Sequence, residues 1–162
     1  MLSSVDLLAT LAAITGQELD SSQLADSTNM LPGFVGEPKK NLRNDLIISP
    51  YKPSHLTIRK GKWVYIGAQS NGGFVGKKPG SHTFAGPAAI SHIGRINSDI
   101  EKGKLKRDAA PAQLYDLEAD PNQTKNLFTQ YPEVVKQLKA ELAVHRSKVK
   151  AAPKRTAKNK KK

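Results

Sequence analysis

The chain has 162 residues, a formal net charge of +12 and no cysteine. A chain of this length has room for one ordinary domain, which buries roughly 70% of the surface that its unfolded chain exposes. The lack of cysteine excludes disulfides, thiolate metal sites and a cysteine nucleophile. Aromatic residues make up only 6% of the chain. The predicted core therefore rests on Leu, Ile, Val and Ala.

The positive charge is concentrated in the last part of the sequence. Nine of the 26 basic residues lie between Arg146 and Lys162, where there is no acidic residue, so the rest of the chain is close to neutral. A Lys-rich segment with few large apolar side chains buries too little surface to offset its loss of conformational entropy. We therefore expect residues 147–162 to form a disordered, solubilising tail. The alternative is weak, salt-sensitive attraction to anionic polymers or membranes.

Targeting signals are not apparent in the sequence. No run approaches the 18 or more apolar residues that a membrane-spanning helix needs, and the first residues lack the basic start and apolar run of a signal peptide. We expect no export signal in the chain as written, and the compartment stays unknown.

Residues 3–16 are predicted to form a helix. Serine precedes the apolar run and Gly16 follows it, which are typical start and stop signals. Two apolar stripes run along the predicted helix: Leu7, Leu11 and Ile14 on one face, and Val5, Leu8 and Ala12 on another. A helix that is apolar on two sides needs neighbours on both. No upstream segment is available to cover the second stripe, and the alternative is that later segments of the same chain cover it.

Short β-branched runs predict an antiparallel sheet after a connecting loop. Residues 17–45 are rich in Asp, Ser, Pro and Gly and are typical of a loop. The predicted strands lie at residues 46–48, 56–59, 63–66 and 113–117. Only Lys60-Gly61-Lys62 separates the second strand from the third, which predicts a hairpin. Alternate side chains would face opposite sides of a half-buried sheet.

The last predicted element is a helix over residues 132–142. Pro132 suits the first turn, and Val135, Leu138 and Leu142 recur at the spacing of one helix face. The predicted fold class is therefore α+β, with a small antiparallel sheet of about four strands, a C-terminal helix packed on it, and an isolated helix before it. The expected divisions are 1–16 (first helix), 17–45 (loop), 46–146 (sheet and helix) and 147–162 (tail).

The Gly- and Pro-rich segment 67–111 is too long for an ordinary connection. It retains Phe74, Phe84 and Ile90, which a disordered linker does not need, so we expect an ordered loop that packs on something. The same segment holds the basic side chains Lys77, Lys78, His82, His92 and Arg95.

Patterns typical of catalysis are scarce. The glycines at 71–76 lack the spacing of a phosphate-binding loop. The four histidines are scattered, with no pair four residues apart on a predicted helix, so we predict no bound metal. Asp116 and Asp120 flank a predicted turn, and we interpret them as turn formers rather than an acid/base pair.

Four segments in the same order resemble the arylsulfatase family: residues 5–16, 26–32, 58–66 and 114–127. The helix start at 131–135 fits as well, so the resemblance covers the chain from Val5 to about Arg146. It implies the C-terminal part of a sulfatase, a sulfuric ester hydrolase, whose first helix belongs to an absent α/β core. The family's N-terminal domain holds Ca²⁺ and a formylglycine made from cysteine in a C-x-P-S-R motif. This sequence contains neither that cysteine nor the metal-binding segment.

The resemblance implies a role in the parent enzyme rather than activity of this chain alone. The chain would complete the fold and shape the substrate pocket, where His82 donates a hydrogen bond to a sulfate oxygen while Lys77, Lys78 and Arg95 attract the charge of the ester. For each of these four residues the alternative is an ordinary surface position. The implied partners are a sulfated ester or sulfated carbohydrate and a separate catalytic half. Members of the family are commonly exported.

Two other functions stay open from the sequence. The first is a non-catalytic anion-binding or interaction module that uses the basic tail. The second is a truncated gene product with no separate role.

Overall fold

The computed structural model describes residues 1–20, 24, 26–36, 38, 40–49, 55–69 and 96–151, and side chains as far as Ser147. At its centre is a four-stranded antiparallel sheet in the order β1-β2-β3-β6. The strands are β1 (Asp45–Ile48), β2 (Thr57–Lys60), β3 (Trp63–Ile66) and β6 (Gln113–Asp116). The predicted hairpin is confirmed, since Lys60 pairs with Trp63 across a turn in which Gly61 has a φ of 54°. A positive φ of this size favours glycine.

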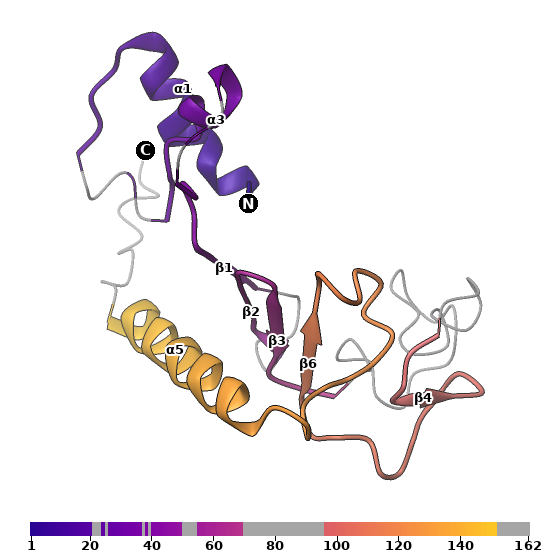
Figure 1. Cartoon of the computed structure of the whole chain (residues 1–162). Coiled ribbons are helices and arrows are strands. Elements are labelled where there is room, and N and C mark those ends of the chain that lie inside the picture. Colours follow the sequence, from indigo (N-terminus) through magenta and orange to yellow (C-terminus); the bar gives the residue numbers. More distant parts are fainter. Residues whose placement is uncertain are drawn as a thin grey trace, which may run out of the picture.

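A long C-terminal helix, α5 (Pro132–Ala151), lies along one face of this sheet, as Figure 1 shows. Val135, Leu138 and Leu142 are buried against the sheet, as the spacing predicts. Their core partners are Ile58, Tyr65, Ala112 and Leu114. The sheet and this helix confirm the predicted α+β class.

Helix α5 ends later than the sequence predicts. It continues past Leu142 to Ala151, into the segment expected to be a disordered tail. Residues 143–151 contain Ala, Lys and Arg and neither Gly nor Pro, so helix propensity carries the helix onward. Residues 152–162 lie outside the described part of the chain.

The N-terminal region consists of η1 (Ser4–Asp6), α1 (Leu7–Thr15) and the short helix α3 (Leu31–Val35). Gly16 ends α1 with a φ of 69°, which confirms the predicted stop. Figure 1 shows α1 and α3 together at one end of the molecule, connected to the sheet by the chain that leads into β1. The core cluster around α5 contains no residue of this region.

Two elements differ from the sequence prediction. Helix α3 lies in the segment expected to be loop, and its five residues are too few to show an apolar period. A small hairpin of β4 (Ile100–Glu101) and β5 (Lys104–Leu105) lies in the segment 67–111, which was expected to be a single long loop. Strands of two residues carry no recognisable alternation.

None of the helices in the described part of the chain combines the length and the apolar content needed to cross a bilayer.

Candidate functional site

The large apolar side chains of α1 face away from the rest of the chain. Leu7, Leu8, Leu11 and Ile14, which we call the leucine face, are between 50% and 58% exposed. The opposite side of the helix is buried and carries small or polar residues: Asp6, Ala9, Thr10 and Ala12. An amphipathic helix of a self-contained domain has the reverse arrangement.

Later segments therefore cover little of either predicted stripe. All three residues of the first stripe are exposed. In the second, Val5 and Leu8 are also exposed, and only Ala12 is buried. The alternative that the chain itself covers the second stripe is wrong for its two large side chains.

A buried carboxylate fixes the orientation of α1. Asp6 is fully buried, and its carboxylate accepts hydrogen bonds from the backbone N–H groups of Ser3 (2.9 Å) and Thr28 (3.0 Å). The Arg43 guanidinium forms an ion pair with the same carboxylate. Burial alone would raise the pKa of Asp6, but the hydrogen bonds from Arg43, Thr28 and Ser3 together lower it below its ordinary value.

Polar contacts extend this cluster to neighbouring segments. The Thr10 hydroxyl donates to the Asp6 carbonyl at 2.6 Å and accepts from the Met30 N–H at 3.0 Å. Arg43 also donates to the Asp45 carbonyl at 3.3 Å, at the start of β1. Hydrogen bonds thus join α1, the segment around Thr28 and the start of β1. Because hydrogen bonds are directional, they fix the orientation of α1 with the leucine face pointing outward.

Sequence reasoning missed this cluster, although part of it carried a signal. A serine followed three residues later by an acidic residue, as in Ser3 and Asp6, is typical of a helix start with a capping box. Arg43 had no such signal, because it lies 37 positions from Asp6 and meets it only in the folded chain.

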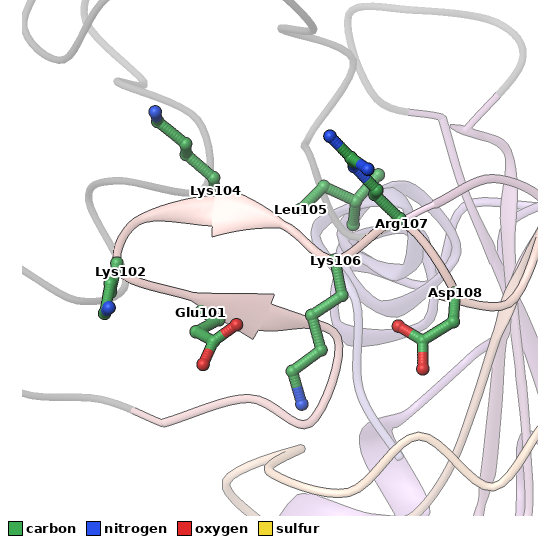
Figure 2. Close-up of a pocket in the computed structure, with 7 residues that line it drawn as sticks. All are labelled: Glu101, Lys102, Lys104, Leu105, Lys106, Arg107 and Asp108. Carbon is green, nitrogen blue, oxygen red and sulfur yellow. The ribbon is translucent and has the colours of Figure 1, made fainter.

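A second candidate surface is the β4–β5 hairpin, which contains a hollow of about 730 Å³. The lining residues, drawn in Figure 2, are Glu101, Lys102, Lys104, Leu105, Lys106, Arg107 and Asp108. Lys104 and Arg107 project to one side of the hairpin, whereas Lys106 projects to the side of Glu101 and Asp108. All six charged side chains are exposed. Within the described part of the chain, the ion pairs formed are Arg43 with Asp6, Lys60 with Glu141 and Lys62 with Asp116, so none involves the hairpin.

Buried polar groups hold the base of the hairpin on the main sheet. The Asn97 side chain donates to the Tyr115 hydroxyl and to the Gln123 carbonyl, both at 2.9 Å. The Asn126 side chain donates to the buried Asp99 carboxylate at 2.7 Å. The hairpin is therefore a supported projection of the fold rather than a free loop.

The predicted site residues Lys77, Lys78, His82 and Arg95 lie outside the described residues, so their roles stay predictions.

The interpretation of Asp116 and Asp120 as turn formers is confirmed. Asp116 accepts hydrogen bonds from the N–H groups of Glu118 (3.1 Å) and Ala119 (3.3 Å), and Asp120 accepts from that of Thr124 (2.6 Å).

The sequence and the described residues were compared with the needs of the cofactors that the family resemblance implies. Without cysteine there is no precursor for formylglycine. In the described ranges, no three His, Asp or Glu side chains group closely enough to hold a metal ion.

Comparisons with known proteins extend the sequence resemblance. No protein-family model matches the chain. Over 138 residues the chain is 30% identical to an N-acetylgalactosamine-6-O-sulfatase of Bacteroides thetaiotaomicron, a match that covers 85% of this chain and 22% of that protein. The fold is similar to that of a solved sulfatase from work on glycosaminoglycan metabolism by Bacteroides thetaiotaomicron, with a TM-score of 0.57 and 27% identity over 88% of this chain and 24% of that one.

The fold and both matches place this chain among sulfatase-related proteins. More specifically, it corresponds to the C-terminal portion of a sulfatase, as the order of its motifs predicts. The chain spans less than a quarter of the length of either relative.

Proposed function

We propose that this chain is the part of a sulfatase that docks on the catalytic part through the leucine face, completes the fold and shapes the pocket for a sulfated ester or sulfated carbohydrate. The catalytic cysteine and the metal ligands would then belong to the catalytic part. The named relative acts, by its name, on 6-O-sulfated N-acetylgalactosamine, which makes a sulfated sugar the expected substrate class.

The exposed leucine face is the observation that carries this proposal. Four large apolar side chains, each at least half exposed, lie together on one helix. Covering the exposed half of each would contribute about 1 kcal/mol per side chain. Contiguous apolar patches of this kind are typical of interaction surfaces. The length of the relatives supplies a candidate for the covering partner, since most of each lies outside the matched stretch.

The buried Asp6 network supports docking rather than misfolding. A helix that exposed its leucines because it lacked a defined position would not bury a carboxylate under an arginine and two backbone N–H groups. Burying a charge is favourable only where its partners are fixed. The inner side of α1 is therefore specified in this chain, and its outer side is left for another part of the protein.

The contribution to the pocket rests on the sequence. His82 would donate a hydrogen bond to a sulfate oxygen, and Lys77, Lys78 and Arg95 would attract the negative charge of the ester. His82→Ala, in an enzyme that contains this chain, tests that role. Unchanged turnover and unchanged KM for every sulfated substrate would remove His82 from the pocket.

Docking is testable in a chimera in which this chain replaces the matched part of the Bacteroides sulfatase. Leu11→Glu should lower the yield of active chimera at least tenfold, because a charge would be buried in the interface. Val144→Glu on α5 is the matched control, since Val144 (54%) and Leu11 (55%) are almost equally exposed. Equal effects of the two substitutions would contradict docking through α1. Hydrolysis of sulfate esters by this chain unaided, as a compact monomer, would contradict the proposed division of labour.

A further inference from the structure

We infer that the β4–β5 hairpin is a binding site for a linear sulfated polysaccharide, which it holds through Lys102, Lys104 and Arg107. The inference rests on the proposed function, because it assumes that the parent protein meets sulfated chains. It adds a contact surface made of residues other than those of the leucine face and other than those predicted to line the pocket.

The arrangement of charges on the hairpin selects one side as cationic. Lys104 and Arg107 project together on the side that carries neither of the two carboxylates (Figure 2). Lys102 lies at the turn between the strands, where its side chain points to the opposite side, that of Glu101 and Lys106, so it adds a positive charge at the tip of the hairpin. These three basic side chains make no hydrogen bond or ion pair with any described residue and are exposed. Sulfate groups accept charge-assisted hydrogen bonds, and the guanidinium fork of arginine donates two in parallel.

The backbone at the tip of the hairpin gives an independent reason to assign a function. The turn residues Lys102 and Gly103 both have positive φ, 48° and 72° respectively. Two-residue turns with two positive φ angles favour Asn, Asp or Gly at the first position. A lysine at that position is strained, and strained residues cluster at functional sites. The strained backbone at Lys102 is explained if the positive charge of its side chain binds a ligand.

The support under the hairpin makes it suitable for binding. Asn97 and Asp99 anchor its first strand to Tyr115 and Asn126 of the main body. The Lys106 N–H donates to the Asp99 carbonyl at 2.9 Å, which closes the second strand on the same base. A site on a supported hairpin loses less conformational entropy on binding than a site on a mobile loop.

The composition of the hairpin favours a polysaccharide over a nucleic acid. Residues 96–108 include no Phe, Tyr or Trp. Proteins that hold single-stranded nucleic acids combine basic grooves with aromatic side chains on which the bases stack. A sulfated polysaccharide offers regularly spaced anions and no bases, so the lysines and the arginine are sufficient to hold it.

The test measures binding of the full chain to chondroitin sulfate and to a single-stranded oligonucleotide over a range of salt concentrations. The variant Lys104→Gln with Arg107→Gln should bind chondroitin sulfate about tenfold more weakly, with a slope against log salt that falls by about 1 to 2. Lys136→Gln with Lys139→Gln removes the same charge from exposed positions of α5 and serves as the control. Both variants keep the C-terminal lysines. Equal losses of affinity for chondroitin sulfate in the two variants would overturn the site. A larger loss of affinity for the oligonucleotide than for chondroitin sulfate in the hairpin variant would also overturn it.

Lys102→Asn provides a second readout that separates a site from a structural feature. Asparagine suits the positive φ, so exchange of the Ile100 N–H, which bonds to Asn97 at 3.0 Å, should slow while chondroitin sulfate binds more weakly. A more stable hairpin with unchanged binding would overturn the role of Lys102. Because this assay needs no sulfate hydrolysis, its failure is distinguishable from failure of docking through α1.

Discussion

The two regions of this chain place charge and apolar surface in opposite ways. Around the sheet, Leu138 and Leu142 of α5 are buried against Leu114, and the Lys60–Glu141 ion pair is partly exposed. Around α1, the Asp6 carboxylate is buried and Leu11 is exposed. The first region has the pattern of a self-contained fold. The second has the pattern of a surface that another part of a protein covers.

The comparison shows that two kinds of interaction orient the two regions. Apolar burial is not directional, so the sheet and α5 need only the right face and volume. Hydrogen bonds are directional. The hydrogen bonds that the Ser3 and Thr28 N–H groups donate to the Asp6 carboxylate therefore hold α1 in one orientation, even though its leucines stay at least half exposed.

The largest expected effect separates a core leucine from a leucine of the exposed face. Leu114 is fully buried, so Leu114→Ala should lower the free energy of unfolding by about 3 kcal/mol in urea denaturation. Leu11→Ala should change it by less than about 0.5 kcal/mol, since the side chain is 55% exposed. Similar losses would remove the contrast between the two regions.

The next effect concerns the buried carboxylate. Asp6→Ala leaves the Arg43 guanidinium without its partner, so the N-terminal region should lose about 3 kcal/mol of local stability. Hydrogen exchange of the Ala9 N–H, which bonds to Ser27 at 3.0 Å, reports that loss. The Leu114 N–H, bonded to the Asn126 side chain, is the control and should keep its protection. Equal acceleration of both amides would mean that the regions unfold together.

A smaller, pH-dependent effect follows from the lowered pKa of Asp6. A carboxyl with a folded pKa below its unfolded value stabilises the fold fully above the unfolded value and loses that contribution as pH falls through the folded pKa. Protection of the Ala9 N–H should therefore be constant at pH values well above the ordinary carboxyl pKa and decline as the pH falls below that value. Asp6→Asn, compared under the same conditions, should lose most of this pH dependence. A decline of the same size in that variant would exclude Asp6 as its cause.

The smallest expected effect is at the surface ion pair between Lys60 and Glu141, whose charged atoms are 2.6 Å apart. The hydrogen bond from Lys60 lowers the pKa of Glu141, but both side chains are substantially exposed. Lys60→Ala should therefore cost no more than about 0.5 kcal/mol, and high salt should remove the difference. A salt-independent loss above about 2 kcal/mol would show that this pair contributes as a buried one does.

Local patterns in the sequence were sufficient to predict the self-contained region. The hairpin through Gly61 and the stripe of Val135, Leu138 and Leu142 each depend on neighbours close in sequence, and the structure confirms both. The sequence prediction ended α5 at Leu142, whereas the helix continues to Ala151. It continues because no Gly or Pro lies between Leu142 and Pro153.

The parts that sequence reasoning missed depend on distant or very short segments. Asp6 meets Arg43 across 37 positions, which no local pattern records. The β4–β5 hairpin has strands of two residues, and its Lys102-Gly103 turn lacks the usual Asn-Gly signal. The two apolar stripes of α1 were predicted from the sequence. That the chain buries the small and polar side of this helix and leaves the leucines exposed was not predicted, because periodicity does not reveal which side of a helix the chain covers.

The most direct measurement uses the absence of cysteine to place a single thiol on the leucine face. Leu11→Cys should react with a thiol reagent as fast as Lys139→Cys on α5 when this chain is alone, because both positions are exposed. In the chimera with the Bacteroides sulfatase, site-resolved mass spectrometry should show Leu11→Cys protected at least tenfold and Lys139→Cys unchanged. Equal labelling of Leu11→Cys in the chain and in a folded chimera would contradict docking through the leucine face.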